Sequence, residues 1–254
     1  MTMTPLEALP RVVVWFSCGA ANAVAAKLTL AKYAGKNEVV IARCVIDNEH
    51  PDHDRFAADC AGWFEHPITE LRSTEYTDAW DVWERTRWLV GPAGARCTTE
   101  LKKRVRQDFE RAGDIHVMGY TAEETKRADR FREQNWELTL EAPLIDAGLG
   151  KADCLAMIER AGIELGAMYR LGYNHSNCIG CVKGSAGYWN KIRVDFPDVF
   201  DRMAKLERNI GASICKVGDA RTYLDELPPD AGRDEPQLDI ECSLLCVMAE
   251  QNYK

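Results

Sequence analysis

The feature that most constrains the fold is a short apolar run near the start of the chain, residues 12–16, with the sequence Val-Val-Val-Trp-Phe. A run this short and this rich in β-branched side chains is typical of a buried strand in a parallel sheet. The small residues 17–21 follow directly, and an alanine-rich stretch with strong helix propensity continues to about residue 32. The sequence therefore predicts a strand, a tight turn and a helix in immediate succession.

This strand-to-helix corner is a candidate anion site. Free backbone N–H groups and the positive end of the helix dipole attract phosphate or sulfate to a helix N-terminus. Ser17 can add a hydroxyl group, and Gly19 permits a conformation or a close approach that a Cβ atom would block. The alternative is an ordinary corner with no ligand, and this stretch alone does not decide between the two.

Strand-like and helix-like patterns alternate from residue 12 to about residue 163. Alternation of this kind indicates parallel βαβ units. We therefore expect an α/β fold, a doubly wound and mostly parallel sheet with helices on both faces, in a core over residues 1–165. Residues 166–254 are expected to form a cysteine-bearing, helical C-terminal region that packs on this core.

Composition limits the classes to which the chain can belong. It has 254 residues, is 46% apolar and 28% charged, and has a formal charge of -8, which argues against a protein whose main task is to coat nucleic acid. No apolar run is long enough to span a bilayer, and the first residues do not form a signal peptide. We therefore expect a cytoplasmic protein with no membrane partner, in which ten cysteines indicate metal, cluster or redox chemistry.

Polar residues follow two of the predicted strands at their carboxyl ends, where ligand sites lie in open α/β sheets. Asp47 comes directly after the second strand, and Gly119 follows a later one. Between them, a run of lysines and arginines that begins at Lys102 follows Cys97. Such a run is usually a solvated helix face, but beside a cysteine and a loop it also attracts an anionic ligand or lowers the pKa of the thiol.

Four cysteines near the end of the chain form two pairs. Two residues separate Cys178 from Cys181, the spacing that lets both thiolates reach one ion or cluster. Cys242 and Cys246 form a looser pair, and folding can bring both pairs together with Cys97. A structural zinc site, a thiol–disulfide pair and plain packing of the looser pair on a helix face remain alternatives. Four other cysteines lie in apolar periodic segments and are expected to be small buried hydrophobic residues: Cys18, Cys44, Cys60 and Cys154.

These stretches together resemble the phosphoadenosine phosphosulfate reductase family, in the wider PP-loop group of nucleotide-binding proteins, and above all its short bacteriophage members. Residues 17–24 are similar to that family's loop Ser-Phe-Gly-x-Gln-Ala-Ala-Val, and residues 96–102 to its cysteine-to-lysine segment. Residues 119–127 resemble its Gly-x-Arg-x-x-Glu segment, and residues 172–181 its Gly-Tyr followed by Cys-x-x-Cys. Residues 241–244 resemble the start of its Glu-Cys-Gly-Leu-His motif.

The resemblance implies an enzyme that binds an adenine sulfonucleotide and reduces it to sulfite. Cys242 would attack the sulfate sulfur as a thiolate, and a thioredoxin-like thiol donor would then release sulfite. It also implies a [4Fe–4S] cluster, with zinc as the alternative, held by Cys97, Cys178, Cys181 and Cys246; Cys242 could take the fourth place instead. The residues that it assigns to the nucleotide are Ser17, Gly19, Asn22, Asp47, Lys102, Gly119, Glu124 and Arg127.

Two other hypotheses remain open. The first is an iron–sulfur PP-loop transferase that uses ATP to modify a base or sulfur group in transfer RNA or DNA. The second is a catalytically altered nucleotide-binding protein on a reductase fold, as the substitutions at Asn22, Asn48 and Thr121 would suggest. The sequence does not predict the number of subunits.

Overall fold

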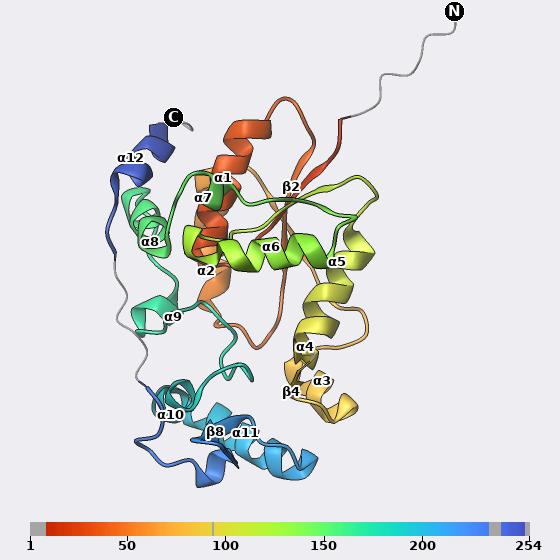
Figure 1. The fold of residues 1–254 in the computed structure, drawn as a ribbon, viewed down its shortest axis with the longest axis vertical. Helices are drawn as coiled ribbons and strands as arrows, with labels where there is room; N and C mark the ends of the chain where they lie inside the picture. Colours follow the sequence, from red (N-terminus) through yellow and green to blue (C-terminus); the bar gives the residue numbers. More distant parts are fainter. Residues whose placement is uncertain (1–8, 93, 234–239, 252–254) are drawn as a thin grey trace, which may run out of the picture.

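The computed structural model describes residues 9–92, 94–233 and 240–251. A five-stranded parallel sheet of order β3-β2-β1-β6-β7 forms its centre (Figure 1). This is a Rossmann-like α/β fold, and the expected fold class is confirmed. The strands are β1 (Val12–Trp15), β2 (Val39–Cys44), β3 (Ile68–Leu71), β6 (Ile115–Val117) and β7 (Thr139–Glu141).

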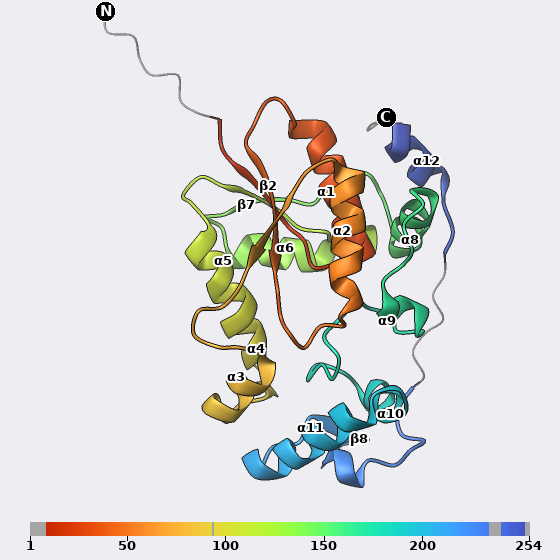
Figure 2. The same ribbon diagram turned by 180° about the vertical axis from the view of Figure 1, so that it is seen from behind.

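Helices cover both faces of the sheet (Figures 1 and 2). On one face, Val12 and Val14 pack with α1, α2 and α8, and on the other, Val13 and Trp15 contact Phe109 of α5. The residues of β1 are all buried because neighbouring strands and both helical layers enclose them. These helices are α1 (Ala20–Tyr33), α2 (Asp52–Phe64), α5 (Arg104–Phe109), α6 (Thr125–Gln134), α7 (Pro143–Asp146) and α8 (Lys151–Arg160).

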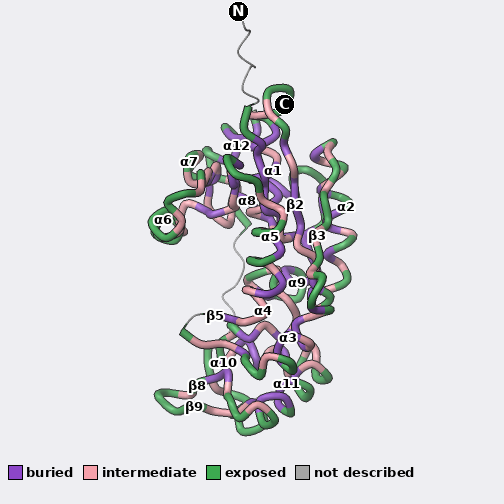
Figure 3. Tube along the Cα trace, turned by 90° about the vertical axis from the view of Figure 1, so that its right-hand side faces the viewer, coloured by how far each residue is buried: buried purple, intermediate pink, exposed green. Residues whose placement is uncertain are grey.

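A second apolar cluster lies beyond the carboxyl ends of the strands (Figures 1 and 3). Trp80 and Trp83 of α3 pack there with Trp189 of α10 and Phe200 of α11. Its elements are α3 (Ala79–Thr86), β4 (Val90–Gly91), β5 (Gly94–Ala95), α4 (Arg96–Thr98), α9 (Ala167–Arg170), α10 (Ala186–Asp195), α11 (Pro197–Ile210), β8 (Cys215–Val217) and β9 (Ala220–Thr222). A π-helical turn, Thr99–Lys103, joins α4 to α5.

The last helix, α12 (Leu244–Gln251), packs on α8 and belongs to the apolar cluster between the sheet and helices α1, α2 and α8, called here the sheet's apolar cluster (Figure 2). Cys246 and Ala249 are buried there. Side-chain packing thus crosses the boundary expected at residue 165, because α3 joins the C-terminal helices and α12 joins the sheet. The division into two parts stays a prediction. In the described part of the chain, no helix is both long enough and apolar enough to cross a membrane.

Candidate functional site

A pocket of about 240 Å³ opens at the carboxyl ends of β1, β2 and β6. The order of the strands reverses between β1 and β6, and open α/β sheets bind their ligands at such a switch point. Ser17 and Asn22 line the pocket from the β1–α1 corner, and Gly119 lines it from the loop after β6. The predicted location of the site at this edge of the sheet therefore coincides with a cavity.

The side chain of Asn22 joins the two loops at the switch point. Its Nδ2 donates to Ser17 Oγ at 2.5 Å, and its Oδ1 accepts a hydrogen bond from the backbone N–H of Gly119 at 3.0 Å. A Cβ atom at Gly119 would lie 2.4 Å from Asn22 Oδ1 and 2.8 Å from the backbone nitrogen of Asn22. Glycine is therefore required at position 119 for this close approach.

The corner itself differs from the expectation in two ways. Cys18, and not Gly19, has a left-handed backbone with φ near 53°, while Gly19 is extended with φ near -97°. Tyr169 lies against the start of α1, where its hydroxyl oxygen accepts the backbone N–H groups of Ala20 and Ser176. Burial raises the pKa of Tyr169 to about 12, so the hydroxyl stays protonated. Part of the predicted backbone anion site is thus occupied by a side chain, and Gly19 does not line the pocket.

Three cations line the pocket instead. Lys102 lies on the π-helical turn and Arg106 one turn later on α5, while Arg127 faces them from α6. Arg127 pairs with Glu124 at 2.5 Å, which is the acidic side chain of the pocket lining. Glu49 pairs with Lys102 from outside the lining, so three positive groups against two carboxylates leave a net positive wall, suited to a phosphate or sulfate group. π-helical turns are often found at functional sites.

A buried hydrogen-bonded chain connects Lys102 to the cysteine loop. Lys102 Nζ lies 3.3 Å from Glu49 Oε1, and Glu49 Oε2 lies 3.1 Å from His53 Nδ1. His53 Nε2 lies 2.7 Å from Ser176 Oγ, two residues before Cys178. Burial alone would raise the pKa of Glu49, but His53 and Lys102 hold it below its usual value. Burial opposes the charge of Lys102, yet Glu49 raises its pKa above the usual range. The ammonium group is therefore fixed as a cation.

Three of the four predicted cluster ligands share one neighbourhood. Cys97, Cys178 and Cys181 interact electrostatically with one another and pack with the second apolar cluster. Burial raises the pKa of Cys178 to about 12 and also raises that of Cys97, and Lys102 opposes both shifts. Within the described ranges, no three His, Cys, Asp or Glu side chains converge as a single metal ion requires. The [4Fe–4S] cluster, with zinc as the alternative, therefore stays a prediction.

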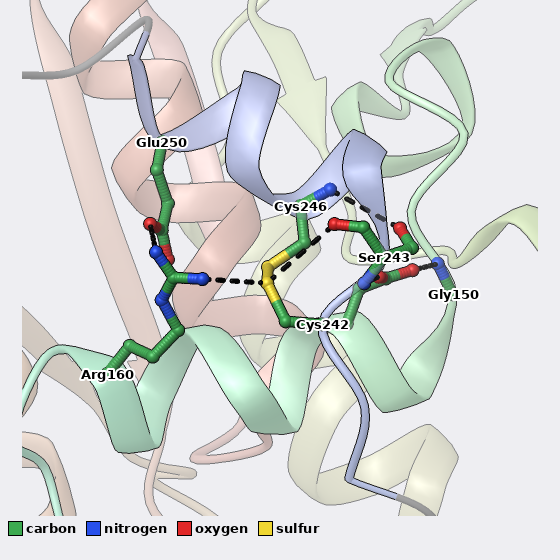
Figure 4. Close-up of a disulfide and its surroundings, with 7 residues drawn as sticks. Gly150, Arg160, Cys242, Ser243, Cys246 and Glu250 are labelled. Carbon is green, nitrogen blue, oxygen red and sulfur yellow. Dashed lines mark hydrogen bonds and ion pairs between the residues drawn. A yellow bond between two sulfur atoms is a disulfide. The ribbon is translucent and has the colours of Figure 1, made fainter.

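The other two predicted cysteines lie elsewhere. Cys242 and Cys246 form a disulfide at the start of α12, on the outer side of α8 (Figure 4). Cys246 belongs to the sheet's apolar cluster, whereas Cys97, Cys178 and Cys181 pack in the other cluster. The structure therefore does not bring Cys246 to the other predicted ligands, and Cys242 does not line the pocket.

Among the other predicted residues, Asp47 lies apart from the pocket. Its side chain is 60% exposed and pairs with Arg72 at 2.9 Å. Glu49, two residues later, points inward instead. Of the cysteines expected to be buried, Cys44 is half-buried and lines the pocket. The other three are buried: Cys18, Cys60 and Cys154.

Sequence reasoning missed His53 and Tyr169, and it noted Glu49 in a polar cluster and Arg106 in the basic run without assigning either to the site. Arg106 had a signal, because it follows Lys102 by four residues and so shares its helix face. Glu49 and His53 are also spaced by four, with Glu49 in the turn before α2 and His53 in its first turn. Tyr169 lies about 150 residues from the start of α1, where its hydroxyl group is placed, and no local sequence pattern predicts that contact. No family model matches this chain, and no curated protein does either.

Proposed function

We propose that the protein is an enzyme of sulfur metabolism that binds an adenine sulfonucleotide and reduces its sulfate group to sulfite. The observation that carries the proposal is the group of three cations, Lys102, Arg106 and Arg127, around a pocket at the switch point of the sheet. A sulfonucleotide presents adjacent phosphate and sulfate charges, which match this wall. Trp15 and Tyr120 add apolar surface for the nucleoside. The resemblance to the phosphoadenosine phosphosulfate reductases supplies the identity of the nucleotide.

The chemistry follows from a thiolate and the cationic wall. The thiolate of Cys242 attacks the sulfate sulfur, so that an S–S bond forms and the bond from sulfur to the phosphate oxygen breaks. Lys102 and Arg106 stabilise the negative charge that develops on the leaving phosphate. A thiol donor then attacks the Cys242 sulfur of the thiosulfonate, which forms a disulfide and releases sulfite. The proposal requires that the disulfide be reduced first and that Cys242 move from α8 to the pocket.

A cluster, as the resemblance implies, would be held by Cys97, Cys178 and Cys181, since these three share a neighbourhood beside Lys102. Bound there, it would supply negative charge and electron-transfer capacity at the end of the hydrogen-bonded chain from the pocket. With or without a cluster, a backbone hydrogen bond positions the loop that bears Cys178. The N–H of Ile179 donates to the carbonyl oxygen of Asn48 at 2.8 Å.

A second candidate function is an iron–sulfur PP-loop transferase that modifies transfer RNA or DNA with ATP. One observation favours it: the three grouped thiols lie beside Lys102, whereas Cys242 is remote from the pocket. In such a transferase, Cys97, Cys178 and Cys181 act as cluster ligands, and Cys242 does not have to reach the nucleotide. Binding of ATP in preference to a sulfonucleotide, with salt-sensitive binding of nucleic acid, would favour the transferase.

The test is calorimetric titration of the reduced, full-length protein with 3′-phosphoadenosine 5′-phosphosulfate, alongside a sulfite assay. Lys102→Met should weaken binding by about tenfold or more, as expected for a lost charge-assisted hydrogen bond. Lys103→Met is the matched control, because Lys103 is the next residue on the same turn and is exposed; we expect less than a twofold change. Cys242→Ser should retain binding and abolish sulfite release.

Three outcomes would contradict the proposal. Equal losses in Lys102→Met and Lys103→Met would place the nucleotide outside the pocket. Sulfite release that survives Cys242→Ser would remove the nucleophile. Tight binding without any sulfite release by the wild-type protein would instead identify a catalytically altered nucleotide-binding protein.

A further inference from the structure

The two sulfurs of the disulfide have different surroundings (Figure 4). Cys246 is fully buried and packs in the sheet's apolar cluster with Ala249. Cys242 packs against the edge of the same cluster but is partly exposed, and its sulfur accepts a hydrogen bond from Arg160 Nη1 at 3.1 Å. A thiol that approaches from solvent therefore reaches the sulfur of Cys242 and not that of Cys246.

The charge beside Cys242 favours its thiolate. Arg160 presents one nitrogen to the sulfur and another to Glu250, whose carboxylate lies 2.7 Å away. Asp153, in the first turn of α8, accepts the backbone N–H groups of Ser243 and Gly150, whereas Arg160 is the last residue of that helix. Cys242 also precedes the first turn of α12, whose dipole favours negative charge. A guanidinium group and a helix N-terminus both lower a thiol pKa.

A purely structural role does not account for this pair well. The bridge joins residues only four apart, and the stabilisation that a disulfide gives by restricting the unfolded chain is smallest for such short loops. In the reducing compartment that we expect for this protein, disulfides that form are usually transient and catalytic or redox-sensing. An exposed, cation-paired sulfur bonded to a buried one is the arrangement that thiol–disulfide exchange uses.

We propose that Cys242 and Cys246 are a redox-active pair that exchanges two electrons with a dithiol, with Cys242 as the sulfur that the dithiol attacks and Cys246 as the resolving cysteine. One thiolate of the dithiol attacks Cys242, so that a mixed disulfide forms, the bond between Cys242 and Cys246 breaks, and Cys246 leaves and takes a proton. The second thiol of the donor then displaces Cys242 as a thiolate beside Arg160. The donor ends as a disulfide and the protein has gained two electrons. The reverse sequence reduces an oxidised partner.

The experiment traps the mixed disulfide on the native, oxidised, full-length protein. The probe is a thioredoxin-type protein whose second cysteine is replaced by serine, and the adduct is quenched in acid and mapped by mass spectrometry. We expect the probe on Cys242 in at least about tenfold excess over Cys246, because only Cys242 is accessible. Cys154, a buried free cysteine on the same helix α8, should carry no probe. The rate at which dithiothreitol reduces the disulfide is measured alongside the rate of adduct formation with the protein probe. A higher rate with the protein probe would indicate a protein donor, and equal rates would indicate a small dithiol.

Two variants test the role of the charge. In the dithiothreitol-reduced protein at pH 7, Arg160→Met should slow alkylation of Cys242 by iodoacetamide by about three- to tenfold. Glu250→Gln breaks the same ion pair but keeps the guanidinium group, so its rate should not fall.

Three results would overturn the proposal. The first is probe on Cys246 as often as on Cys242. The second is a disulfide that resists dithiothreitol in the folded protein and is reduced only in urea. The third is an equal fall in both charge variants, which would make Arg160 a structural contact. Thiol exchange needs no nucleotide, so these results are independent of the test of the pocket.

Discussion

Replacing Gly119 by alanine is the sharpest test of the switch-point geometry. The added Cβ would lie 2.4 Å from Asn22 Oδ1, 2.8 Å from the backbone nitrogen of Asn22 and 2.9 Å from the carbonyl carbon of Ala21. Two of these three atoms belong to the backbone of α1, so a side-chain rotation cannot relieve the overlap. The loop after β6 and the start of α1 must separate, and the hydrogen bond from Gly119 to Asn22 is lost with that movement.

The expected loss in the free energy of unfolding has two parts. Overpacking against fixed atoms typically costs about 1–3 kcal/mol, and the lost hydrogen bond adds about 1 kcal/mol. We therefore expect Gly119→Ala to lower the free energy of unfolding by about 2–4 kcal/mol, measured by urea denaturation with an unchanged m value. Nucleotide binding should weaken as well, because Gly119 lines the pocket.

Gly62→Ala is the matched control. Gly62 lies inside α2, and a Cβ there would meet no atom within 4 Å. The substitution improves helix propensity and should stabilise the protein by about 0.5–1 kcal/mol. The two alanine variants should therefore shift stability in opposite directions. Equal stability of Gly119→Ala and the wild type would refute the close approach of the two loops.

Three further predictions concern charge. Arg11→Met leaves Asp114 buried without its guanidinium partner, which lies 2.6 Å away, and should cost about 3–5 kcal/mol in urea denaturation, whereas the exposed Arg111→Met should cost less than about 1 kcal/mol. Burial raises the pKa of Glu207 to about 7 from 4.5, so the folded state keeps a proton that the unfolded chain loses. The free energy of unfolding should consequently fall by roughly 3 kcal/mol as pH rises from about 4 to about 8, and Glu207→Gln should remove that fall. Asp47→Asn should change the Kd for nucleotide by less than about twofold, because its side chain pairs with Arg72 outside the pocket; a larger loss would show that the pocket extends to it.

The sheet was predictable because its signals are local. The apolar run at β1 is buried throughout, and β2 is apolar except for Arg43, whose buried guanidinium group pairs with Asp54 and Glu70. Helical patterns separate most of the strands. The pattern of residues 138–144 predicts a longer last strand than β7, which spans Thr139–Glu141. This strand ends at Glu141 because Pro143, which fits the first turn of a helix, begins α7.

The site was predictable only in part, because its contacts are distant in sequence. The pattern placed Lys102 and Gly119 near one edge of the sheet, the family resemblance added Asn22, and the pocket brings all three together. It did not predict that Tyr169 caps α1 or that Glu49 turns inward while Asp47 turns outward. Those outcomes depend on how residues 166–181 fold back over the strand ends, and no periodicity in either segment encodes that contact.

The positions of the two cysteine groups constrain the chemistry more than their spacing in sequence does. Cys178 is linked to the pocket through Lys102 and Glu49, whereas the Cys242–Cys246 pair is held on α8 by Arg160. A sulfonucleotide reductase therefore needs the tail to move on reduction, and a cluster enzyme does not. Because the disulfide joins Cys242 to Cys246 in the sheet's own apolar cluster, oxidation would hold Cys242 away from the pocket in the proposed reductase. In the reductase reading, the redox state of the tail thus decides whether the first step of catalysis can occur.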